Sequence, residues 1–389
     1  MEHTSLVHNI FLIFTGAAIL ATIALYARQA LLVAYIALGF LFGPAVFGLV
    51  EDPQLIQSIA HIGVIFLLFL LGLNMPPQKL IPMFKETIWV AGISSVIFFA
   101  VGFSFAYLFE LTLIESVFVG ISFTFSSTII GLKLLPTTAL HHQHVGEIII
   151  SILLFQDVIA IIVLMAIKAD WVEQSIAFEG IKLVVSLVGL IGFAYLFERY
   201  ILIKLIQRFD QIQEYIFLMT IGWCLGLAQI AAFLDLSEEI GAFIAGVVLA
   251  TNPISIFIGD TLRPLRDFFL IIFFFALGAS FEMDMVEDVL LLSFSLAALA
   301  LIIKPLLYDY LLYKYGEARV ISKETAARLG QTSEFSLLIA VLALETGLIS
   351  MKVNYLIQVS TIMTFIASSY YIVMRYPSPM AVSDKLRRD

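Results

Sequence analysis

Asp157 and Lys304 are charged residues that lie deep inside long apolar segments. Asp157 carries the only charge between Glu147 and Lys168, a stretch long enough to cross a bilayer. Along a helix, Asp157 is about 15 Å from Glu147 and Lys304 about 15 Å from Lys314, roughly half of the ~30 Å hydrocarbon core. A carboxylate at that depth costs ~2.5–3.5 kcal/mol on insertion scales, so it is expected to serve a function. The two residues therefore indicate an ion or proton pathway.

The composition is that of a membrane protein. Of the 389 residues, 61% are hydrophobic and 13% charged, and the mean hydropathy is +1.04. A soluble domain of this composition would not stay in solution. We expect an all-α, polytopic membrane protein with an uncleaved first helix. We expect a transporter rather than an enzyme, with no cofactor and no nucleic-acid partner.

Charged residues divide the chain into about thirteen transmembrane helices. Most of the 21 Lys and Arg residues fall on one side if the N-terminus is outside, so the positive-inside rule predicts an external N-terminus and a cytoplasmic C-terminus. The predicted spans are residues 7–27, 30–50, 55–74, 87–109, 113–135, 147–168, 179–203, 214–235, 238–258, 267–281, 289–313, 326–347 and 353–374.

An odd number of spans allows an inverted repeat. If the seventh span is a linker, the helices before and after it form two six-helix halves of opposite orientation, as in many secondary transporters. The fifth helix of each half contains small polar residues, Ser126-Ser127-Thr128 in one and Gly330-Gln331-Thr332-Ser333-Glu334 in the other. Such residues can satisfy backbone groups where a helix unwinds, and they can also simply pack helices closely. Because the two segments occupy matching places, we predict crossed, broken helices 5 and 12.

Seven motifs in order resemble the membrane domain of Kef-type monovalent cation:proton antiporters, within the cation:proton antiporter superfamily. They are Gly39–Pro44, Phe69–Leu73, Ser126–Thr128, Leu154–Asp157, Gly241–Gly246, Phe274–Gly278 and Gly330–Phe335. The resemblance covers nearly the whole chain. It implies a homodimer in a bacterial inner membrane, with a dimerisation scaffold and a mobile core.

The resemblance assigns a role to each part of the chain. Scaffold helices 1–3 occupy residues 1–75 and scaffold helices 8–10 residues 213–283; core helices 4–6 occupy 86–168 and core helices 11–13 occupy 288–375; the linker helix is 179–206 and the cytoplasmic tail 376–389. Kef-type potassium systems usually continue into a cytosolic nucleotide-binding domain, so we expect gating by nucleotide or glutathione here only if the chain is truncated or a separate cytosolic regulatory subunit supplies it. The chain also departs from the family at Asn74, Thr332 and Ser333, where glutamate and two glycines are usual.

Exchange requires that a proton and a cation compete for one site, because either one neutralises a buried carboxylate. We predict that Asp157 is that site, with oxygens of Gln156, Ser127 and Thr128 completing the shell of a bound monovalent cation, the only metal expected. Ser126, with Thr332 and Ser333, would line the broken helices. Since relatives with electrogenic exchange often have a second acid at the Gln156 position, glutamine there favours electroneutral exchange.

Two further charged residues are assigned to the core. Lys304 has two readings: it pairs with Asp157 and is displaced by the cation, or it braces the core by contacting a carbonyl of a broken helix. Pro305 beside it frees a carbonyl in the same helix, which supports the bracing role. Glu334 either takes part in the site, as the resemblance suggests, or pairs with Arg328 near the interface.

Several questions stay open at this stage. Potassium, sodium and lithium all suit carboxylate and hydroxyl oxygens, so the cation is not determined. An ion-gated sensor that binds an ion without moving it would also keep Asp157. A cation channel would be expected to show a pore loop or a charged ring, and neither is apparent. An intramembrane aspartyl protease would need a second facing aspartate, and Asp309 lies too near the interface. His141, His142 and His144 could sense pH, although histidines in a short loop are more often simply solvated.

Overall fold

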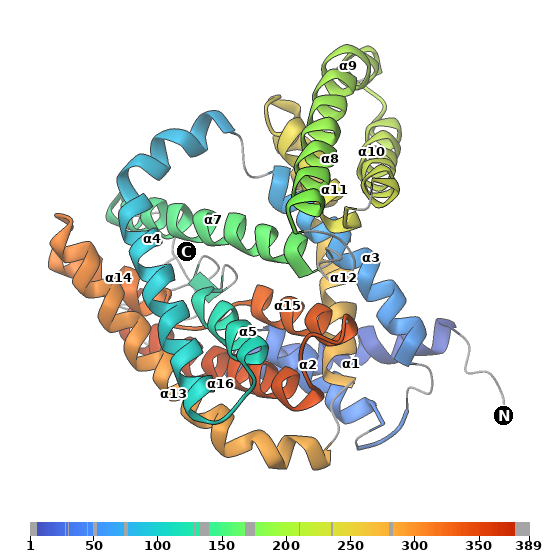
Figure 1. Cartoon of the computed structure of the whole chain (residues 1–389). Coiled ribbons are helices and arrows are strands. Elements are labelled where there is room, and N and C mark those ends of the chain that lie inside the picture. Colours follow the sequence, from blue (N-terminus) through green and yellow to red (C-terminus); the bar gives the residue numbers. More distant parts are fainter. Residues whose placement is uncertain are drawn as a thin grey trace. The chain divides into compact units, whose positions relative to one another are not determined.

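The computed structural model is all-helical, with no strand among the residues that it describes (Figure 1). These are residues 6–377, apart from positions 28, 30, 45, 50–52, 74–76, 128–129, 132–139, 168–175, 210, 235 and 280–282. The helices are α1 (Leu6–Tyr26), α2 (Leu31–Phe42), α3 (Pro53–Leu73), α4 (Pro77–Leu108), α5 (Leu113–Thr124), α7 (Leu140–Ile167), α8 (Ile176–Phe197), α9 (Ile203–Arg208), α10 (Gln213–Phe233), α11 (Glu238–Leu249), α12 (Ile254–Ala279), α13 (Met283–Lys314), α14 (Arg319–Arg328), α15 (Glu334–Glu345) and α16 (Met351–Arg375). A π-helical turn, Glu198–Leu202, joins α8 to α9.

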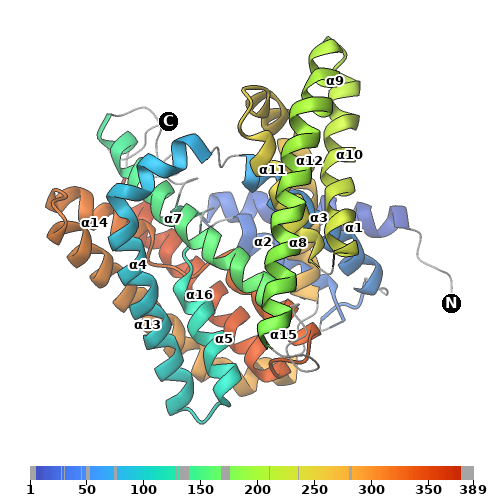
Figure 2. The ribbon, with the colours of Figure 1, turned by 45° about the horizontal axis from the view of Figure 1, so that its top comes forward.

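The helices form two compact units. In the first, α13 packs against α14 and α16, and α15 packs against α5 and α16 (Figure 2). In the second, α11 packs against α3 and α10. The first unit consists of Met1–Glu51, Met83–Val163 and Leu277–Asp389, and the second of Asp52–Pro82 and Leu164–Ala276. All the residues predicted to bind or support the ion belong to the first unit.

Seven helical segments of the described part are long and apolar enough to cross a membrane. They are residues 7–26, 87–108, 144–164, 185–208, 213–233, 288–314 and 351–375. Shorter apolar helices, among them α2 and α5, lie between them. The predicted spans 113–135 and 326–347 are interrupted, since α5 ends at Thr124 and a non-helical segment separates α14 from α15. The prediction of an all-helical membrane protein with broken fifth and twelfth helices is confirmed.

One predicted helix boundary is wrong. The arginines Arg263 and Arg266 were expected to separate two spans, 238–258 and 267–281, but both lie inside α12. Arg263 forms an ion pair with Asp260, and Arg266 forms one with Asp267, each with 2.8 Å between Nη2 and Oδ1. The helix therefore continues through its charged residues. The chain breaks earlier, at Asn252-Pro253, where the Asn252 side chain accepts a hydrogen bond from the backbone N–H of Ile254.

Glycines allow close helix packing within the second unit. A Cβ added to Gly246 of α11 would overlap the carbonyl oxygen of Phe69 in α3 and lie 2.8 Å from the backbone nitrogen of Leu73. Gly72 of α3 faces the same contact, since its Cβ would overlap the carbonyl oxygen of Phe243. Rigid backbone surrounds both positions, so neither neighbour can easily move aside. These two glycines of the recognised motifs therefore serve helix packing.

We expect Gly246→Ala to destabilise the protein by about 1–3 kcal/mol, the usual cost of overpacking a closed contact. Gly226→Ala in α10 is the matched control, because no atom lies within 4 Å of its added Cβ. Alanine is also the better helix former, so the control should melt at the same temperature as the wild type or slightly higher. Thermal unfolding in detergent compares them. Equal melting temperatures for both variants would show that α3 and α11 do not pack this closely.

Candidate ion-binding site

The break after α5 is held by the side chain of Gln156 from α7. Phe125 follows the helix in an extended conformation, with φ −79° and ψ 148°. The Oε1 atom of Gln156 accepts a hydrogen bond from the N–H of Ser126 at 2.9 Å, and its Nε2 donates to the carbonyl oxygen of Thr124 at 3.0 Å. Ser127 Oγ accepts from the N–H of Ile130 at 3.2 Å and so starts the chain's return to helix. Side chains thus satisfy the N–H groups of Ser126 and Ile130 and the carbonyl of Thr124 at the break.

The break between α14 and α15 is satisfied in a similar way. Gln331 Nε2 donates to the carbonyl oxygen of Arg328 at 2.8 Å, and its Oε1 accepts from Ser368 Oγ of α16 at 2.9 Å. The N–H of Thr332 donates to Thr364 Oγ1 at 3.2 Å. Ser333 is the N-cap of α15, accepting from the N–H of Phe335 at 3.1 Å. Thr332 Oγ1 also forms a hydrogen bond with Thr364 Oγ1 at 2.8 Å, so the hydroxyls of Thr332 and Ser333 both contribute to the break.

The two breaks contact each other directly. Ser126 Oγ donates to the carbonyl oxygen of Leu329 at 2.9 Å, and Gln331 Nε2 also lies 3.4 Å from the carbonyl oxygen of Ser127. All four residues are buried, and each contributes a polar side-chain or backbone atom to these contacts. The predicted crossing of the fifth and twelfth helices is present.

Lys304 of α13 bridges this crossing. Its Nζ donates to the carbonyl oxygen of Phe125 at 2.6 Å and to that of Gln331 at 3.0 Å. The Phe125 carbonyl directly follows the C-terminal end of α5, where the helix dipole concentrates negative partial charge, and Gln331 lies three residues beyond the end of α14. The side chain is fully buried, and Nζ also lies 5.3 Å from the ring centroid of Phe98. Of the two readings of Lys304, these contacts describe the brace.

Asp157 follows Gln156 on α7 and is 3% exposed. Its Oδ2 atom is buried and has no hydrogen-bond partner among the described residues. Glu334, in the first turn of α15, is close enough to interact with it electrostatically. The contacts of the described residues include no ion pair between Asp157 and Lys304. A buried carboxylate with an unpaired oxygen and a second carboxylate near it is suited to bind a proton or a monovalent cation.

The remaining predicted residues fall in different places. Thr128 lies outside the described residues, as do the side chains of His141 and His142. His144 Nε2 lies 3.1 Å from Glu317 Oε2, at the exposed end of α7 and away from the crossing. Arg328 forms an ion pair with Glu324, with 2.8 Å between Nη2 and Oε1. Both residues belong to α14.

Tyr308 belongs to the crossing and was not predicted. Its hydroxyl accepts a hydrogen bond from Gln156 Nε2 at 2.8 Å, and the side chain is fully buried. The ring also packs edge-on against Phe98, with 5.1 Å between centroids. Tyr308 lies one helical turn after Lys304, so the i, i+4 spacing in α13 was a signal that could have found it.

The sequence profile described as "Sodium/hydrogen exchanger, transmembrane" matches residues 10–373. The chain belongs to this family. In fold, the exchanger resembles the sodium proton antiporter MjNhaP1 from Methanocaldococcus jannaschii, with a TM-score of 0.72, 16% identity, and coverage of 94% of this chain and 95% of that one. At such low identity the likeness concerns the fold alone.

Sequence relatives of the exchanger carry several names. It is 25% identical to the iron transporter MagA of Paramagnetospirillum magneticum, over 89% of this chain and 80% of the relative. It is 32% identical to a glutathione-regulated potassium-efflux system protein of Haemophilus influenzae, over 65% of this chain and 42% of the relative. It is 26% identical to K+ efflux antiporter 5 of Arabidopsis thaliana, over 98% of this chain and 68% of the relative. The exchanger thus matches less than half of the length of the Haemophilus protein.

Proposed function

We propose that this exchanger moves a monovalent cation, potassium or sodium, across a membrane in exchange for protons, with Asp157 as the shared site. The observation that carries the proposal is the buried carboxylate of Asp157, with Oδ2 left without a hydrogen bond among the described residues, beside the crossing of two broken helices. Membership of the sodium/hydrogen exchanger family and the potassium-efflux names of the relatives support it.

The mechanism follows from the cost of a buried charge. An empty, ionised Asp157 is strongly disfavoured in this setting, so it crosses the membrane only when a proton or a cation neutralises it. A proton and a cation cannot bind Asp157 at the same time. The site crosses in one direction with a cation bound and in the other direction with a proton bound. Oxygens of Ser127, Thr128 and Glu334 are proposed to complete the cation shell. Gln156 is proposed mainly to position the break, because both ends of its amide already form hydrogen bonds there.

Movement of a core against a scaffold would expose the site alternately to the two sides. We propose the scaffold at residues 1–75 and 213–283 and the core at 86–168 and 288–375, with two copies of the chain joined through their scaffolds. The N-terminus is proposed outside, because positive charge is concentrated on the opposite side. A bacterial inner membrane is proposed from the resemblance to Kef-type antiporters. A separate cytosolic subunit is proposed to regulate transport, because the longer relative from Haemophilus influenzae is named a glutathione-regulated system.

The identity of the cation is tested by proton flux in proteoliposomes containing the wild-type protein. We expect an added gradient of potassium or sodium to drive proton movement, and the rate to be unchanged when the membrane potential is clamped. Ferrous iron is included because one relative is named an iron transporter. Cation flux without proton movement would contradict exchange and indicate a channel. Cation binding without any flux would contradict exchange and indicate a sensor.

A further inference from the structure

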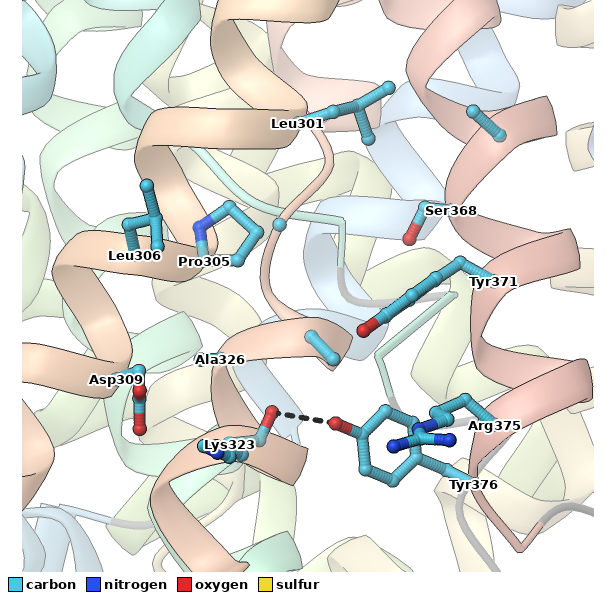
Figure 3. A pocket seen from close by; sticks show the side chains of 13 residues that line it. Leu301, Pro305, Leu306, Asp309, Lys323, Ala326, Ser368, Tyr371, Arg375 and Tyr376 are labelled. Carbon is cyan, nitrogen blue, oxygen red and sulfur yellow. Dashed lines mark hydrogen bonds between the residues drawn. The ribbon is translucent and has the colours of Figure 1, made fainter. Parts of the chain in front are cut away.

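A cavity of about 620 Å³ lies among α13, α14 and α16, apart from Asp157 (Figure 3). Its inner end is formed by Pro305, Gly330 and Ser368. Gly330 is packed so closely that an added Cβ would lie 2.7 Å from Pro305 Cγ. Ser368 donates its hydroxyl to Gln331 of the twelfth-helix break. The cavity therefore extends from the back of the break to the exposed side chains of Lys323 and Arg375.

The walls of the cavity carry two positive charges and one negative charge. Lys323 of α14 and Arg375 of α16 are exposed and line the cavity, and neither forms an ion pair with another described residue. Asp309 stands on the α13 wall, opposite Tyr371 and Tyr376 (Figure 3). Two cations near one anion match a ligand that carries a phosphate and, a few atoms away, an ammonium group.

The Asp309 carboxylate in the wall of the cavity can accept a further hydrogen bond. Asp309 Oδ2 lies 3.3 Å from Nη1 of Arg319, an exposed ion pair of small energetic value. Its Oδ1 atom has no hydrogen-bond partner among the described residues. The opposite wall is comparatively fixed, because Tyr376 donates its hydroxyl to the carbonyl oxygen of Lys323 at 3.2 Å. An ammonium could therefore be bound at Asp309 without breaking a strong contact.

An apolar surface leads away from the cavity along α13. Leu306 lines the cavity and is 65% exposed, and Ile302, one turn further along, is 59% exposed. Phe294 and Leu291 continue the same exposed strip past the middle of α13, toward its N-terminal end. In a membrane-spanning helix such a strip contacts acyl chains. The cavity thus joins a polar, charged recess to a lipid-facing surface, which favours a lipid over a soluble molecule.

We propose that this cavity binds the headgroup of a phospholipid that carries a primary ammonium, the phosphatidylethanolamine class. The phosphate lies between Lys323 and Arg375, the ammonium bonds to Asp309, and an acyl chain lies along Leu306 and Ile302. The inference does not depend on which cation the exchanger moves. It assigns a role to the charged residues at this end of α13, α14 and α16, which the ion-binding site does not use.

Native mass spectrometry of the full chain in detergent tests this, with dioleoyl phosphatidylethanolamine, dioleoyl phosphatidylglycerol and soluble phosphoethanolamine as probes. We expect the ethanolamine lipid to be retained in preference to the glycerol lipid. Lys323→Gln combined with Arg375→Gln should weaken retention of both lipids roughly tenfold or more, because charged hydrogen bonds to phosphate are lost. Asp309→Asn should remove only the preference between the two lipids.

Lys314→Gln is the matched control, since Lys314 is an exposed lysine on α13 that does not line the cavity. Size exclusion and thermal unfolding report folding for each variant. Because Lys323 and Arg375 are exposed, their variants decide the question even if Asp309→Asn is not recovered. Equal binding of the two lipids to wild type, equal losses in Lys314→Gln and the double variant, or binding of phosphoethanolamine without either lipid would each overturn the proposal.

Discussion

Asp157→Asn is expected to abolish cation-driven proton movement while leaving the protein folded. The amide has nearly the shape of the carboxyl group, so helix packing around this buried side chain is kept. It cannot take up or release a proton, and it offers a cation no negative charge. Both halves of the exchange therefore fail together. Proton flux in proteoliposomes, driven by a gradient of potassium or sodium, measures the loss.

Asp260→Asn provides the matched control for this loss. Asp260 is an exposed aspartate on α12 that pairs with Arg263 at 2.8 Å, outside the unit that contains Asp157. Its replacement should leave the flux close to that of the wild type. Cation-dependent proton flux that persists in Asp157→Asn, or that disappears equally in Asp260→Asn, would remove Asp157 from the centre of the mechanism.

Lys304→Met should lower the free energy of unfolding by about 2–5 kcal/mol. Methionine fills much of the same space but donates no hydrogen bond, so the carbonyl oxygens of Phe125 and Gln331 are left buried without their donor. Each such group costs ~1–3 kcal/mol, and relief from burying the ammonium offsets part of the sum. Lys314→Met, on the exposed end of α13, should change stability little. Thermal unfolding in detergent compares the two variants.

The same variant separates the two readings of Lys304. If Lys304 is only a brace, exchange that remains in Lys304→Met keeps the sensitivity to membrane potential of the wild type. If its ammonium is displaced by the cation during transport, the charge moved per cycle changes, and so does that sensitivity. Flux measured with and without a clamped potential distinguishes the two. A variant as stable as the wild type would contradict the bracing contacts themselves.

The broken helices could be predicted because the signal for them is local. Small polar residues within an apolar span can also pack helices closely, but two such segments fell in matching places, which favoured a break in each helix. The structure shows what those residues do: Ser126 reaches Leu329, and Ser333 caps α15. The membrane depth of Asp157 and Lys304 could also be predicted from the sequence, because distance along a helix follows from residue number.

The partners of the buried polar groups could not be predicted in the same way. Residue number gives the depth of Lys304 and Asp157 but not the rotation of α13 relative to α7, which decides whether the ammonium meets a carboxylate or a carbonyl. The amide of Gln156 was expected beside a cation, yet both of its ends are used by the break. The boundary near Arg263 was misplaced because local ion pairs let a helix continue through its charges.

Competition between a proton and a cation for one carboxylate is tested most directly by proton release on cation binding. In weakly buffered detergent solution, potassium or sodium added to the wild-type protein should release protons, at those pH values where Asp157 is protonated. Asp157→Asn should release none, although it remains folded. Proton release of equal size from Asp157→Asn, or cation binding to the wild type with no release at any pH at which it is stable, would contradict exchange at Asp157.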